Sequence, residues 1–310
     1  MKKDFLLSVI IPAYNEQGNI SDLIDKLLPV VEKYSYEIIF VDDGSKDATE
    51  EEIRKAAHEN KNIKLIAFTR NFGHQTALTC GYSHAQGDCV VTIDADLQDP
   101  PELIHDMVKK WQEGFKIVYA KRQVRDESFF KTMTADLFYD LINLLSQTPI
   151  PRNVGDYRLI DKEVVALLNE MPERFRFLRG MVAWGGFKST FVNFDRKKRE
   201  SGQTHYPVSK MIGFALNGIV SFSTRPLRIA TFIGILASIV GLVGIVYAIY
   251  RRLFLPSLYW VPGWTATFVA IMFFGGVQLI TIGIIGEYIG KIYSEIQGRP
   301  QYLIKEKINL

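Results

Sequence analysis

The chain has 310 residues, 47% hydrophobic and 23% charged, which is enough for a domain with a sizeable core and an additional segment. Its formal net charge of +3 is too small to indicate nucleic acid, so we expect no nucleic-acid partner. The two cysteines, Cys80 and Cys89, match neither a disulfide framework nor a zinc-binding spacing, and we expect reduced, buried thiols.

Strands and helices alternate in the first part of the chain. Runs rich in valine and isoleucine predict strands over residues 6–14, 37–45, 63–69, 88–96 and 116–122. The segments between them predict helices over residues 20–33, 49–59, 74–85 and 101–112. Near-continuous apolar strands separated by helices are typical of a mostly parallel sheet with helices on both faces. The sequence therefore predicts an α/β, Rossmann-like domain. No cleavable signal peptide is recognisable before it, so we expect this domain to stay in the cytoplasm.

Polar residues follow each of the five predicted strands. In chain order they are Tyr14, Asn15 and Glu16; Asp42 to Ser45; Arg70, Asn71 and Gly73; Asp94 and Asp96; and Arg122 and Arg125. Open α/β sheets bind their ligands at the carboxyl ends of parallel strands, which meet at one edge of the sheet. The five clusters together predict a ligand site at that edge, although any one of them could be ordinary loop polarity.

The acidic pair Asp94 and Asp96 forms an Asp-x-Asp motif at the end of a strand. Carboxylate oxygens suit a hard divalent cation, and Mg²⁺ typically takes one or two of them and fills its shell with phosphate oxygens and water. A single Asp-x-Asp is more often a solvated turn. No glycine-rich phosphate loop and no paired-histidine spacing is present in the sequence. A cation site here therefore needs a diphosphate ligand held mainly by the metal and by arginines.

The last third of the chain contains two long uncharged segments, between Arg228 and Arg251 and between Arg252 and Glu287. A membrane-spanning helix needs about 20 apolar residues, so we expect two spans rather than a buried soluble hairpin. Basic residues are more frequent before the first segment and after the second than in the connecting loop. This distribution predicts a multi-pass protein of the plasma (inner) membrane with both termini in the cytoplasm. Glycines inside both segments would allow self-association.

The segment before the first span is apolar with few charges, and its spacing is compatible with an interfacial amphipathic helix over residues 206–225. A helix packed on the soluble domain is the alternative. A basic run, Arg196 to Arg199, precedes it and could attract anionic headgroups or hold a lipid phosphate. Since arginine binds phosphate in a bidentate manner, Arg199 is the preferred candidate there, and Arg179 is preferred in the stretch RFRFLRG.

Six motifs carry a resemblance to a known family: SVIIPAYNE, VDDGS, RNFGHQTAL, DADLQDP, GDYRL and RFLRG. They resemble the inverting family 2 glycosyltransferases of the GT-A fold. The closer resemblance is to the polyisoprenyl-phosphate glycosyltransferases, which include dolichol-phosphate mannose synthase and the bactoprenol glucosyltransferases of the GtrB type. The resemblance covers nearly the whole chain. With the hydropathy pattern, it implies a GT-A catalytic domain at 1–205, the interfacial helix at 206–225, a two-helix transmembrane hairpin at 226–290 and a cytoplasmic tail at 291–310.

The resemblance also implies roles for individual positions. Residues expected to bind the nucleotide sugar are Pro12, Tyr14, Glu16, Asp42, Asp43, Asp94 and Gln98. Residues expected to bind Mg²⁺ or Mn²⁺ on the diphosphate are Asp94 and Asp96. Residues expected to take part in catalysis are Asp156, Asp96 and the phosphate-binding Arg122. Residues expected at the lipid phosphate are Arg199, Arg179 and His205, the last of which stands where relatives often have a lysine.

The implied reaction is the inverting transfer of a hexose, with glucose from UDP-glucose as first choice, to undecaprenyl or another polyisoprenyl phosphate. A phosphate monoester with a second pKa near ~6 is already mostly dianionic at neutral pH, so a general base is not clearly required. Asp156 could therefore orient the acceptor or the sugar, or could be a turn residue beside Gly155.

Three alternatives remain open on the sequence. The donor could be another nucleotide sugar, such as GDP-mannose or UDP-aminoarabinose. The chain could be a membrane-anchored, non-catalytic binding protein, although the intact Asp94 and Asp96 count against it. It could be a processive polysaccharide synthase, but the Q-x-x-R-W motif of such enzymes is missing. Relatives also suggest a homo-oligomer.

Overall fold

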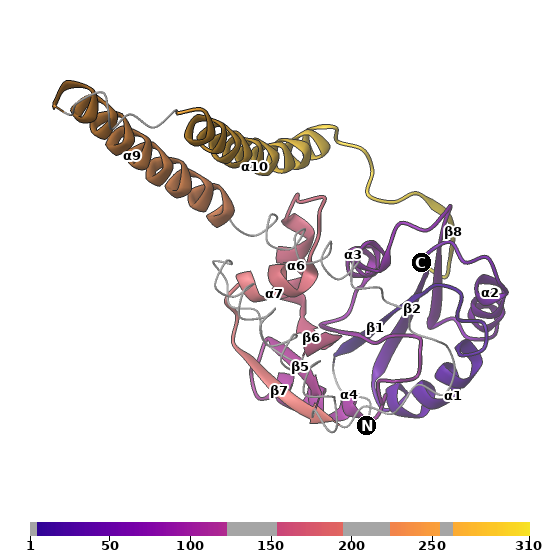
Figure 1. Ribbon diagram of the computed structural model, residues 1–310. Coiled ribbons are helices and arrows are strands. Elements are labelled where there is room, and N and C mark those ends of the chain that lie inside the picture. The colour runs from indigo at the N-terminus through magenta and orange to yellow at the C-terminus, as the bar shows by residue number, and fades with distance from the viewer. Residues whose placement is uncertain (1–4, 123–153, 195–223, 255–262) are drawn as a thin grey trace. The chain divides into compact units, whose positions relative to one another are not determined.

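The structure is a computed structural model that describes residues 5–122, 154–194, 224–254 and 263–310. The described residues fall into two units (Figure 1). One unit contains residues 5–122, 154–194 and 299–310, and the other contains residues 224–254 and 263–298. The C-terminal residues thus belong to the same unit as the N-terminal domain. The predicted interfacial helix at 206–225 lies almost entirely outside the described residues.

The first unit is built on one mixed sheet, to which the described residues contribute eight strands. They are β1 Leu6–Ala13, β2 Ser35–Asp42, β3 Ile63–Phe68, β4 Cys89–Thr92, β5 Ile117–Arg122, β6 Val154–Asp161, β7 Ser189–Phe194 and β8 Ile304–Ile308. Their order in the sheet is β7-β5-β6-β4-β1-β2-β3-β8. The neighbours β4, β1, β2 and β3 are parallel, and so are β5 and β7. The mostly parallel α/β architecture predicted from the sequence is confirmed.

Helices cover both faces of this sheet (Figure 1). They are α1 Ile20–Val31, α2 Thr49–Glu59, α3 His74–His84, α4 Leu103–Gln112, α6 Lys162–Glu170 and α7 Leu178–Trp184. Side chains alternate along a strand, so neighbouring residues of β2 reach different layers. Ile38 and Phe40 pack in the cluster that contains the apolar residues of α1, α2 and α4. Ile39 and Val41 pack with Ala77 and Cys80 of α3. Strands β1 to β4 are therefore buried on both sides, which explains their continuous apolar sequences.

The strand register brings the ends of four parallel strands to one edge. Ala13 at the end of β1 pairs with Asp42 at the end of β2, and Asp42 pairs with Ala67 near the end of β3. On the other side of β1, β4 ends at Thr92, which pairs with Ile10. The loops that follow these strands are consequently neighbours in space, as expected for a ligand site at this edge.

Three strands were not anticipated from the sequence: β6, β7, which pairs parallel with β5, and β8. Strand β6 lies between β4 and β5 and is antiparallel to both. It contains the GDYRL motif, so Asp156 belongs to a strand and not to a turn. Strand β8 pairs antiparallel with β3 at the far edge of the sheet. Part of the segment 291–310, expected to be a tail, thus completes the sheet. Cys80 and Cys89 are free and buried, as predicted.

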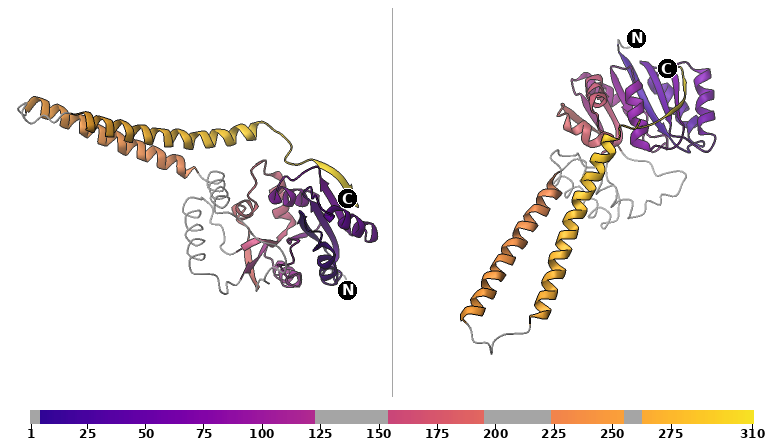
Figure 2. Two further views of the ribbon diagram at one scale, coloured as in Figure 1. Left: turned by 45° about the vertical axis from the view of Figure 1, so that its right-hand side comes forward. Right: turned by 90° about the horizontal axis from the view of Figure 1, so that it is seen from above.

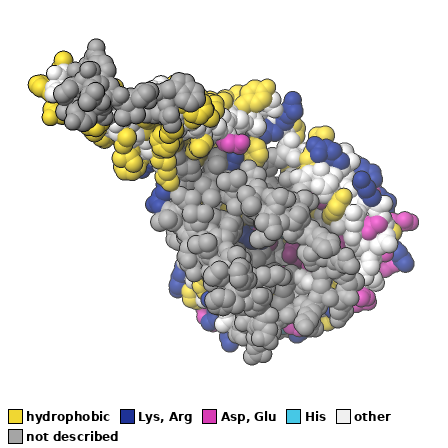
Figure 3. Space-filling view, in the orientation of Figure 1, with side chains coloured by type: hydrophobic (Ala, Val, Ile, Leu, Met, Phe, Trp, Pro, Cys, Tyr) yellow, Lys and Arg dark blue, Asp and Glu magenta, His cyan; other side chains and the backbone are white. Residues whose placement is uncertain are grey.

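The second unit contains two long helices, α9 Arg225–Phe254 and α10 Trp264–Ile296. They lie side by side (Figure 2). Each contains a stretch long and apolar enough to cross a membrane, Leu227–Tyr247 with a mean hydropathy of 2.6 and Thr267–Ile296 with 2.3. Their apolar side chains are largely exposed (Figure 3), unlike those of a core helix in a soluble protein. The two helices suggest a membrane-anchored protein.

Candidate active site

A pocket of about 330 Å³ lies where β1, β2, β3 and β4 end. Its lining residues come from the loops after all four strands: Pro12, Ala13, Tyr14, Glu16, Asp43, Asn71, Gly73, His74, Ala77, Asp94, Ala95 and Asp96. Four of the five polar clusters identified in the sequence therefore contribute to one pocket. The geometry supports the ligand site expected at this edge of the sheet.

The wall of the pocket after β2 and β3 consists of two loops in direct backbone contact. Gly44 has a φ of +69°, and a Cβ atom at this position would lie 2.4 Å from the carbonyl carbon of Arg70. Only glycine fits both the conformation and the space. Next to it, the Asp43 carboxylate accepts hydrogen bonds from the backbone N–H of Phe72 at 2.6 Å and of Gly73 at 2.9 Å. A third bond comes from Asn71 Nδ2 at 2.9 Å. Asp43 therefore holds the Asn71–Gly73 loop in place, and it lines the pocket next to that loop.

The two acids of the VDDGS motif have different surroundings. Asp43 lines the pocket, but Asp42 is 0% exposed and accepts hydrogen bonds from the backbone and hydroxyl of Ser45. Burial raises the pKa of both carboxyls, and the hydrogen bonds that each accepts oppose this rise. Asp42 closes the turn behind the pocket wall, whereas the resemblance had implied that both acids contact the nucleotide.

The loop after β1 also lines the pocket, beside the loop after β2, with which Asn15 exchanges hydrogen bonds. Pro12 is buried at the end of the strand, and Tyr14 presents an exposed ring. The Glu16 carboxylate accepts a hydrogen bond from Asn19 Nδ2 at 2.5 Å, and its backbone N–H donates to Thr49 Oγ1 at 2.8 Å. These contacts tie the loop to the first turns of α1 and α2. Pro12, Tyr14 and Glu16, which were expected to bind the nucleotide sugar, thus line the pocket, whereas Asn15 does not.

Asp94 and Asp96 both line the pocket, as the Asp-x-Asp interpretation requires. The backbone N–H of Gln98 donates to Asp96 Oδ1 at 3.2 Å. The Gln98 side chain itself is buried and does not line the pocket. Among the described residues no group of three or more His, Cys, Asp and Glu side chains is arranged as a metal site. Two carboxylates do suit Mg²⁺ or Mn²⁺ when phosphate oxygens and water complete the shell, so the donor set fits the predicted ion.

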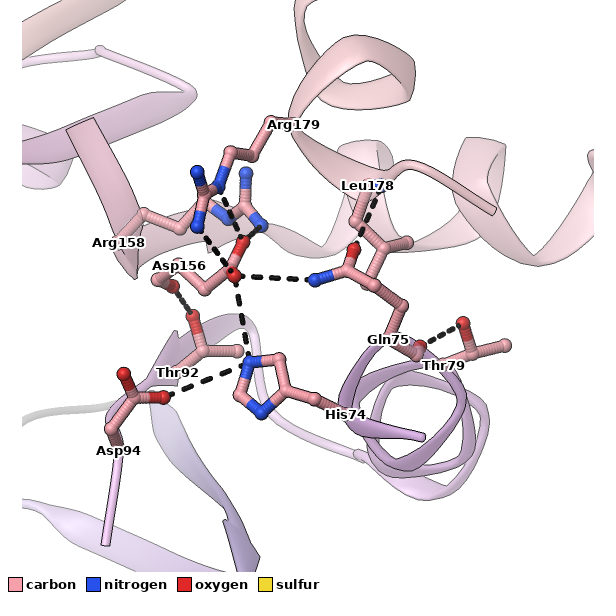
Figure 4. A network of polar contacts seen from close by, with 9 residues as sticks. All are labelled: His74, Gln75, Thr79, Thr92, Asp94, Asp156, Arg158, Leu178 and Arg179. Carbon is pink, nitrogen blue, oxygen red and sulfur yellow. Dashed lines mark hydrogen bonds and ion pairs between the residues drawn. The ribbon is translucent and has the colours of Figure 1, made fainter. Parts of the chain in front are cut away.

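Asp156 does not line the pocket, but it contacts His74, which does, and its carboxylate is surrounded by positively charged and amide donors (Figure 4). It is 6% exposed. Its carboxylate accepts from Arg158 Nη2 at 2.8 Å, from Arg179 Nη2 at 3.1 Å and Nε at 3.2 Å, and from Gln75 Nε2 at 3.2 Å. Burial opposes ionisation of Asp156. The hydrogen bond from His74 and the charges of the two arginines outweigh it and hold the pKa of Asp156 well below its usual range.

The two arginines at Asp156 are not equivalent. The Arg158 side chain is 0% exposed, and within the described part of the chain its Nε and Nη1 find no hydrogen-bond acceptor. It therefore supports Asp156 from the interior and does not reach a substrate. The Arg179 side chain is 28% exposed, which leaves it accessible from the solvent side of the same carboxylate. Arg179 is thus the arginine of the two that a ligand can reach, and its expected contact with the lipid phosphate stays a prediction.

His74 connects the Asp-x-Asp motif to Asp156, a role that was not predicted from the sequence. Its Nε2 lies 3.4 Å from Asp156 Oδ2 and 3.7 Å from Asp94 Oδ1 (Figure 4). Burial opposes protonation, but the bond to Asp156 and the charge of Asp94 raise the pKa of His74. His74 and Gln75 start α3 directly after the Arg70–Gly73 loop. The sequence signal that could have identified these two residues was their place in the RNFGHQTAL motif, at the edge of the sheet where β1 to β4 end.

Three of the predicted site residues cannot be compared with this geometry. Arg122 ends β5, which runs in the same direction as β4, but its side chain is not among those described. Arg199 and His205 lie outside the described residues.

Comparison with known proteins identifies the family. Residues 8–168 match the model of glycosyl transferase family 2, and residues 225–292 match that of the GtrB C-terminal hairpin. An uncharacterised glycosyltransferase of Synechocystis sp. is 47% identical over 97% of this chain and 95% of its own. The bactoprenol glucosyl transferase of Shigella phage SfII is 41% identical over 97% of each chain.

Among solved structures, the glucosyl-3-phosphoglycerate synthase of Mycobacterium tuberculosis in complex with Mn²⁺, UDP-glucose and phosphoglyceric acid is similar in fold alone. Its TM-score is 0.46 at 20% identity, with coverage of 70% of this chain and 78% of that one. The relatives and the two family models, by contrast, match the sequence itself over both units. The chain therefore belongs to the family 2 glycosyltransferases and carries the C-terminal hairpin of the GtrB type.

Proposed function

We propose that the protein transfers a hexose from a nucleotide sugar to a polyisoprenyl phosphate at the cytoplasmic face of the membrane, with inversion at the anomeric carbon. UDP-glucose and undecaprenyl phosphate are the first choices, because bactoprenol glucosyl transferases are similar to this chain over nearly its full length. The observation that carries the proposal is the single pocket that Asp94 and Asp96 line together with Tyr14 and Asp43.

The nucleoside would bind against the loops after β1, β2 and β3. Tyr14 offers an aromatic ring on one side, and Asp43 offers a carboxylate whose position is fixed by the Asn71–Gly73 loop. Pro12 and Glu16 complete that wall. Because hydrogen bonds to the backbone hold Asp43 and the Glu16 loop in place, this part of the pocket is formed before the donor binds, which lowers the entropic cost of binding.

Asp94 and Asp96 would hold Mg²⁺ or Mn²⁺ at the donor diphosphate. The bound ion would stabilise negative charge on the departing nucleoside diphosphate as a Lewis acid. The two side chains supply oxygen donors at fixed positions, and His74 beside Asp94 adds a donor group on the same side of the pocket. We propose Arg122 as a further phosphate contact on the basis of the family resemblance.

We infer that Asp156 orients neighbouring groups and does not abstract a proton. A carboxylate with a strongly lowered pKa is a weak base, and four side chains already donate to this one. A dianionic lipid phosphate needs no base to act as nucleophile. Asp156 instead holds Arg179 and His74, which we propose as cationic groups for the acceptor phosphate, together with Arg199 and His205.

The membrane hairpin would bring the lipid acceptor to the catalytic domain. Strand β7 precedes α9 in the chain and β8 follows α10, yet both strands belong to one sheet. A segment that leaves a domain and returns to it crosses a bilayer an even number of times. This supports two spans with both chain ends on the cytoplasmic side, where basic residues are more frequent. The proposal includes a homo-oligomer formed through the glycine-containing helices.

A donor panel tests the proposed function. The purified full-length protein is incubated with undecaprenyl phosphate and labelled UDP-glucose, other UDP-hexoses, GDP-mannose or UDP-aminoarabinose, with Mg²⁺, with Mn²⁺ or with a chelator. We expect one labelled lipid product, whose anomeric configuration by NMR is opposite to that of the donor, and no product with the chelator. A polymeric product would indicate a processive synthase. No product from any donor would favour a non-catalytic binding protein.

A further inference from the structure

The C-terminal segment forms part of the support of the candidate donor pocket. Strand β8 covers the outer edge of β3, where Phe68 pairs with Ile304. The backbone N–H of Thr69 then donates to the carbonyl oxygen of Leu303 at 3.0 Å. This pairing continues to the last residue before the Arg70–Gly73 loop. Residues that follow the second candidate span therefore hold the strand that leads directly into the pocket wall.

Tyr302 extends this contact to side chains. Its ring is stacked on Phe68, with centroids 5.0 Å apart and planes inclined by 13°. Phe68 in turn meets Phe72 edge to face at 5.8 Å. Tyr302 and Phe72 both pack against the small apolar cluster beneath α3 that contains Phe68 and Cys80. Aromatic pairs of this kind favour one relative orientation, so Tyr302 restricts the position of Phe72 through Phe68.

Phe72 is the link to the pocket. Its backbone N–H and that of Gly73 donate to the Asp43 carboxylate, and Asp43 and Gly73 line the pocket. The Arg70 guanidinium lies 4.0 Å from the centre of the Phe72 ring on the other side of the same loop. The direct contacts thus run from Tyr302 through Phe68 and Phe72 to Asp43, although Tyr302 itself does not line the pocket.

We propose that Tyr302 is a positioning residue of the donor pocket, which keeps the Arg70–Gly73 loop in the conformation that binds the nucleoside diphosphate. The inference rests on the proposed function for the identity of the ligand. Because the residue lies only six positions after the end of α10, the donor pocket depends on a segment that emerges from the membrane hairpin.

Strand β8 and the Asn309 that follows it are attached to the domain by contacts that do not involve Tyr302. Lys305 Nζ lies 2.9 Å from the Glu50 carboxylate, and Arg54 Nη2 lies 2.5 Å from that of Glu306. Asn309 Nδ2 donates to the carbonyl oxygen of Ala57 at 2.6 Å. All three contacts are made with α2, away from the pocket. Loss of the Tyr302 ring should therefore leave the strand in place, which makes a positioning role separable from a purely structural one.

Three full-length variants test this role. Tyr302→Ala removes the ring, Tyr302→Phe keeps it and loses only the hydroxyl contacts to Ser83 and Cys80, and Lys305→Ala removes an ion pair of the strand that follows. Hydrogen exchange of the Phe72 and Gly73 amides is measured by mass spectrometry of overlapping peptides. We expect about tenfold faster exchange in Tyr302→Ala only, with amides of β1 and β2 unchanged, since an aromatic contact and its packing correspond to about a factor of ten.

Binding of UDP with Mn²⁺, measured by titration calorimetry, gives the second readout. We expect about tenfold weaker binding by Tyr302→Ala and unchanged binding by the other two variants. Unchanged exchange and unchanged affinity in Tyr302→Ala would overturn the inference, as would exchange that rises equally throughout the sheet. If the wild type binds no UDP, the proposed function fails on that result, and the exchange at Phe72 and Gly73 still decides the positioning role.

Discussion

At the scale of single residues, the least expected feature is a fully buried arginine that shares one carboxylate with a second arginine. Arg158 and Asp156 lie on one side of β6, and both are buried, with exposed fractions of 0% and 6%. Removal of one partner from a buried ion pair typically costs about 3–5 kcal/mol, because the other charge stays buried without compensation. The stability of the site therefore depends on the pair and not on either residue alone.

We expect Asp156→Asn to lower the melting temperature by about 10 °C, because the charge of Arg158 is then left in the interior. The double variant Asp156→Asn/Arg158→Met should recover most of this loss, since it removes both charges and retains an unbranched side chain. Thermal unfolding of the purified protein in detergent checks both. A double variant less stable than Asp156→Asn alone would contradict the pair interpretation.

The pH dependence of the melting-temperature difference between wild type and Asp156→Asn provides a control. The folded-state pKa of Asp156 is lowered, so its ionisation stabilises the fold fully above the unfolded-state pKa of about 3.9. This contribution is lost as the pH falls toward the folded-state pKa. The melting-temperature difference between wild type and Asp156→Asn should therefore grow as His74 becomes protonated, because Asp156 raises the pKa of His74, and should shrink as the pH falls below about 4.

The Asp-x-Asp motif gives the second prediction. Asp94→Asn and Asp96→Asn should each reduce turnover by about a thousandfold or more, because the ligands for leaving-group stabilisation are lost. Gln98→Ala is the matched control, since this buried neighbour does not line the pocket, and its effect should stay within about tenfold. The initial rate of labelled-lipid formation by each variant measures these effects. Full activity of either aspartate variant without divalent metal would refute the assigned role.

Residue types and their order were enough to find most of the residues that line the pocket, but not the contacts between the residues of the site. Tyr14, Asp43 and Asp94 were identified because polar residues after parallel strands meet at one edge. The separation of Asp42 from Asp43 depends on which side of a turn each carboxylate takes. The role of His74 depends on β6, whose position in the sheet places Asp156 beside α3. Neither of these is a local property of the sequence.

At the scale of elements, α3 lies unusually close to the sheet. A Cβ atom at Gly81 would lie 2.3 Å from Cγ2 of Ile10 on β1. Only a residue without a side chain allows the helix to come this close to β1. The position of the helix in turn determines where His74 and Gln75, at its N-terminus, lie. Close packing of this helix is therefore part of the construction of the active site.

Gly81→Ala is the third prediction. The added methyl group should displace α3 and cost about 1–3 kcal/mol, as overpacked cores do. Because the displacement reaches His74 and Gln75, kcat should fall by more than the loss of folded protein explains. Ile10→Ala creates the missing space, so the double variant Ile10→Ala/Gly81→Ala should be no less stable than Ile10→Ala. Thermal unfolding and single-turnover rates measure these effects, and additive losses would contradict the steric explanation.

Element prediction succeeded where the pattern is local and failed where pairing is distant. The helix expected over 49–59 is the observed α2, because the helical spacing of its buried residues Thr49, Ile53 and Ala57 lies within its own sequence. Strand β6 carries the charged Asp156 and Arg158 at buried positions, so it lacks the apolar run of a central strand. Strand β8 is five residues long with lysines facing outward, and its partner β3 lies far away in the sequence.

At the scale of the whole molecule, one sheet contains strands from both sides of the hairpin. A catalytic domain that ends at residue 205, as expected from the sequence, would lack β8 and would leave the edge of β3 uncovered. The sheet therefore also constrains the topology in the membrane. If both helices span, the ends of the hairpin that connect to β7 and β8 must lie on the same side.

The fourth prediction concerns this topology. Cys80 and Cys89 are buried, so the folded chain should react little with a membrane-impermeant maleimide. Ser257→Cys, in the sequence between α9 and α10, should be labelled in intact cells, because the loop of a two-span hairpin faces outward. Leu310→Cys, two residues after β8, should be labelled only after the membrane is permeabilised. Labelling of both from the same side would mean that the helices do not cross the bilayer as a hairpin. The lipid phosphate would then have to reach the pocket by another route.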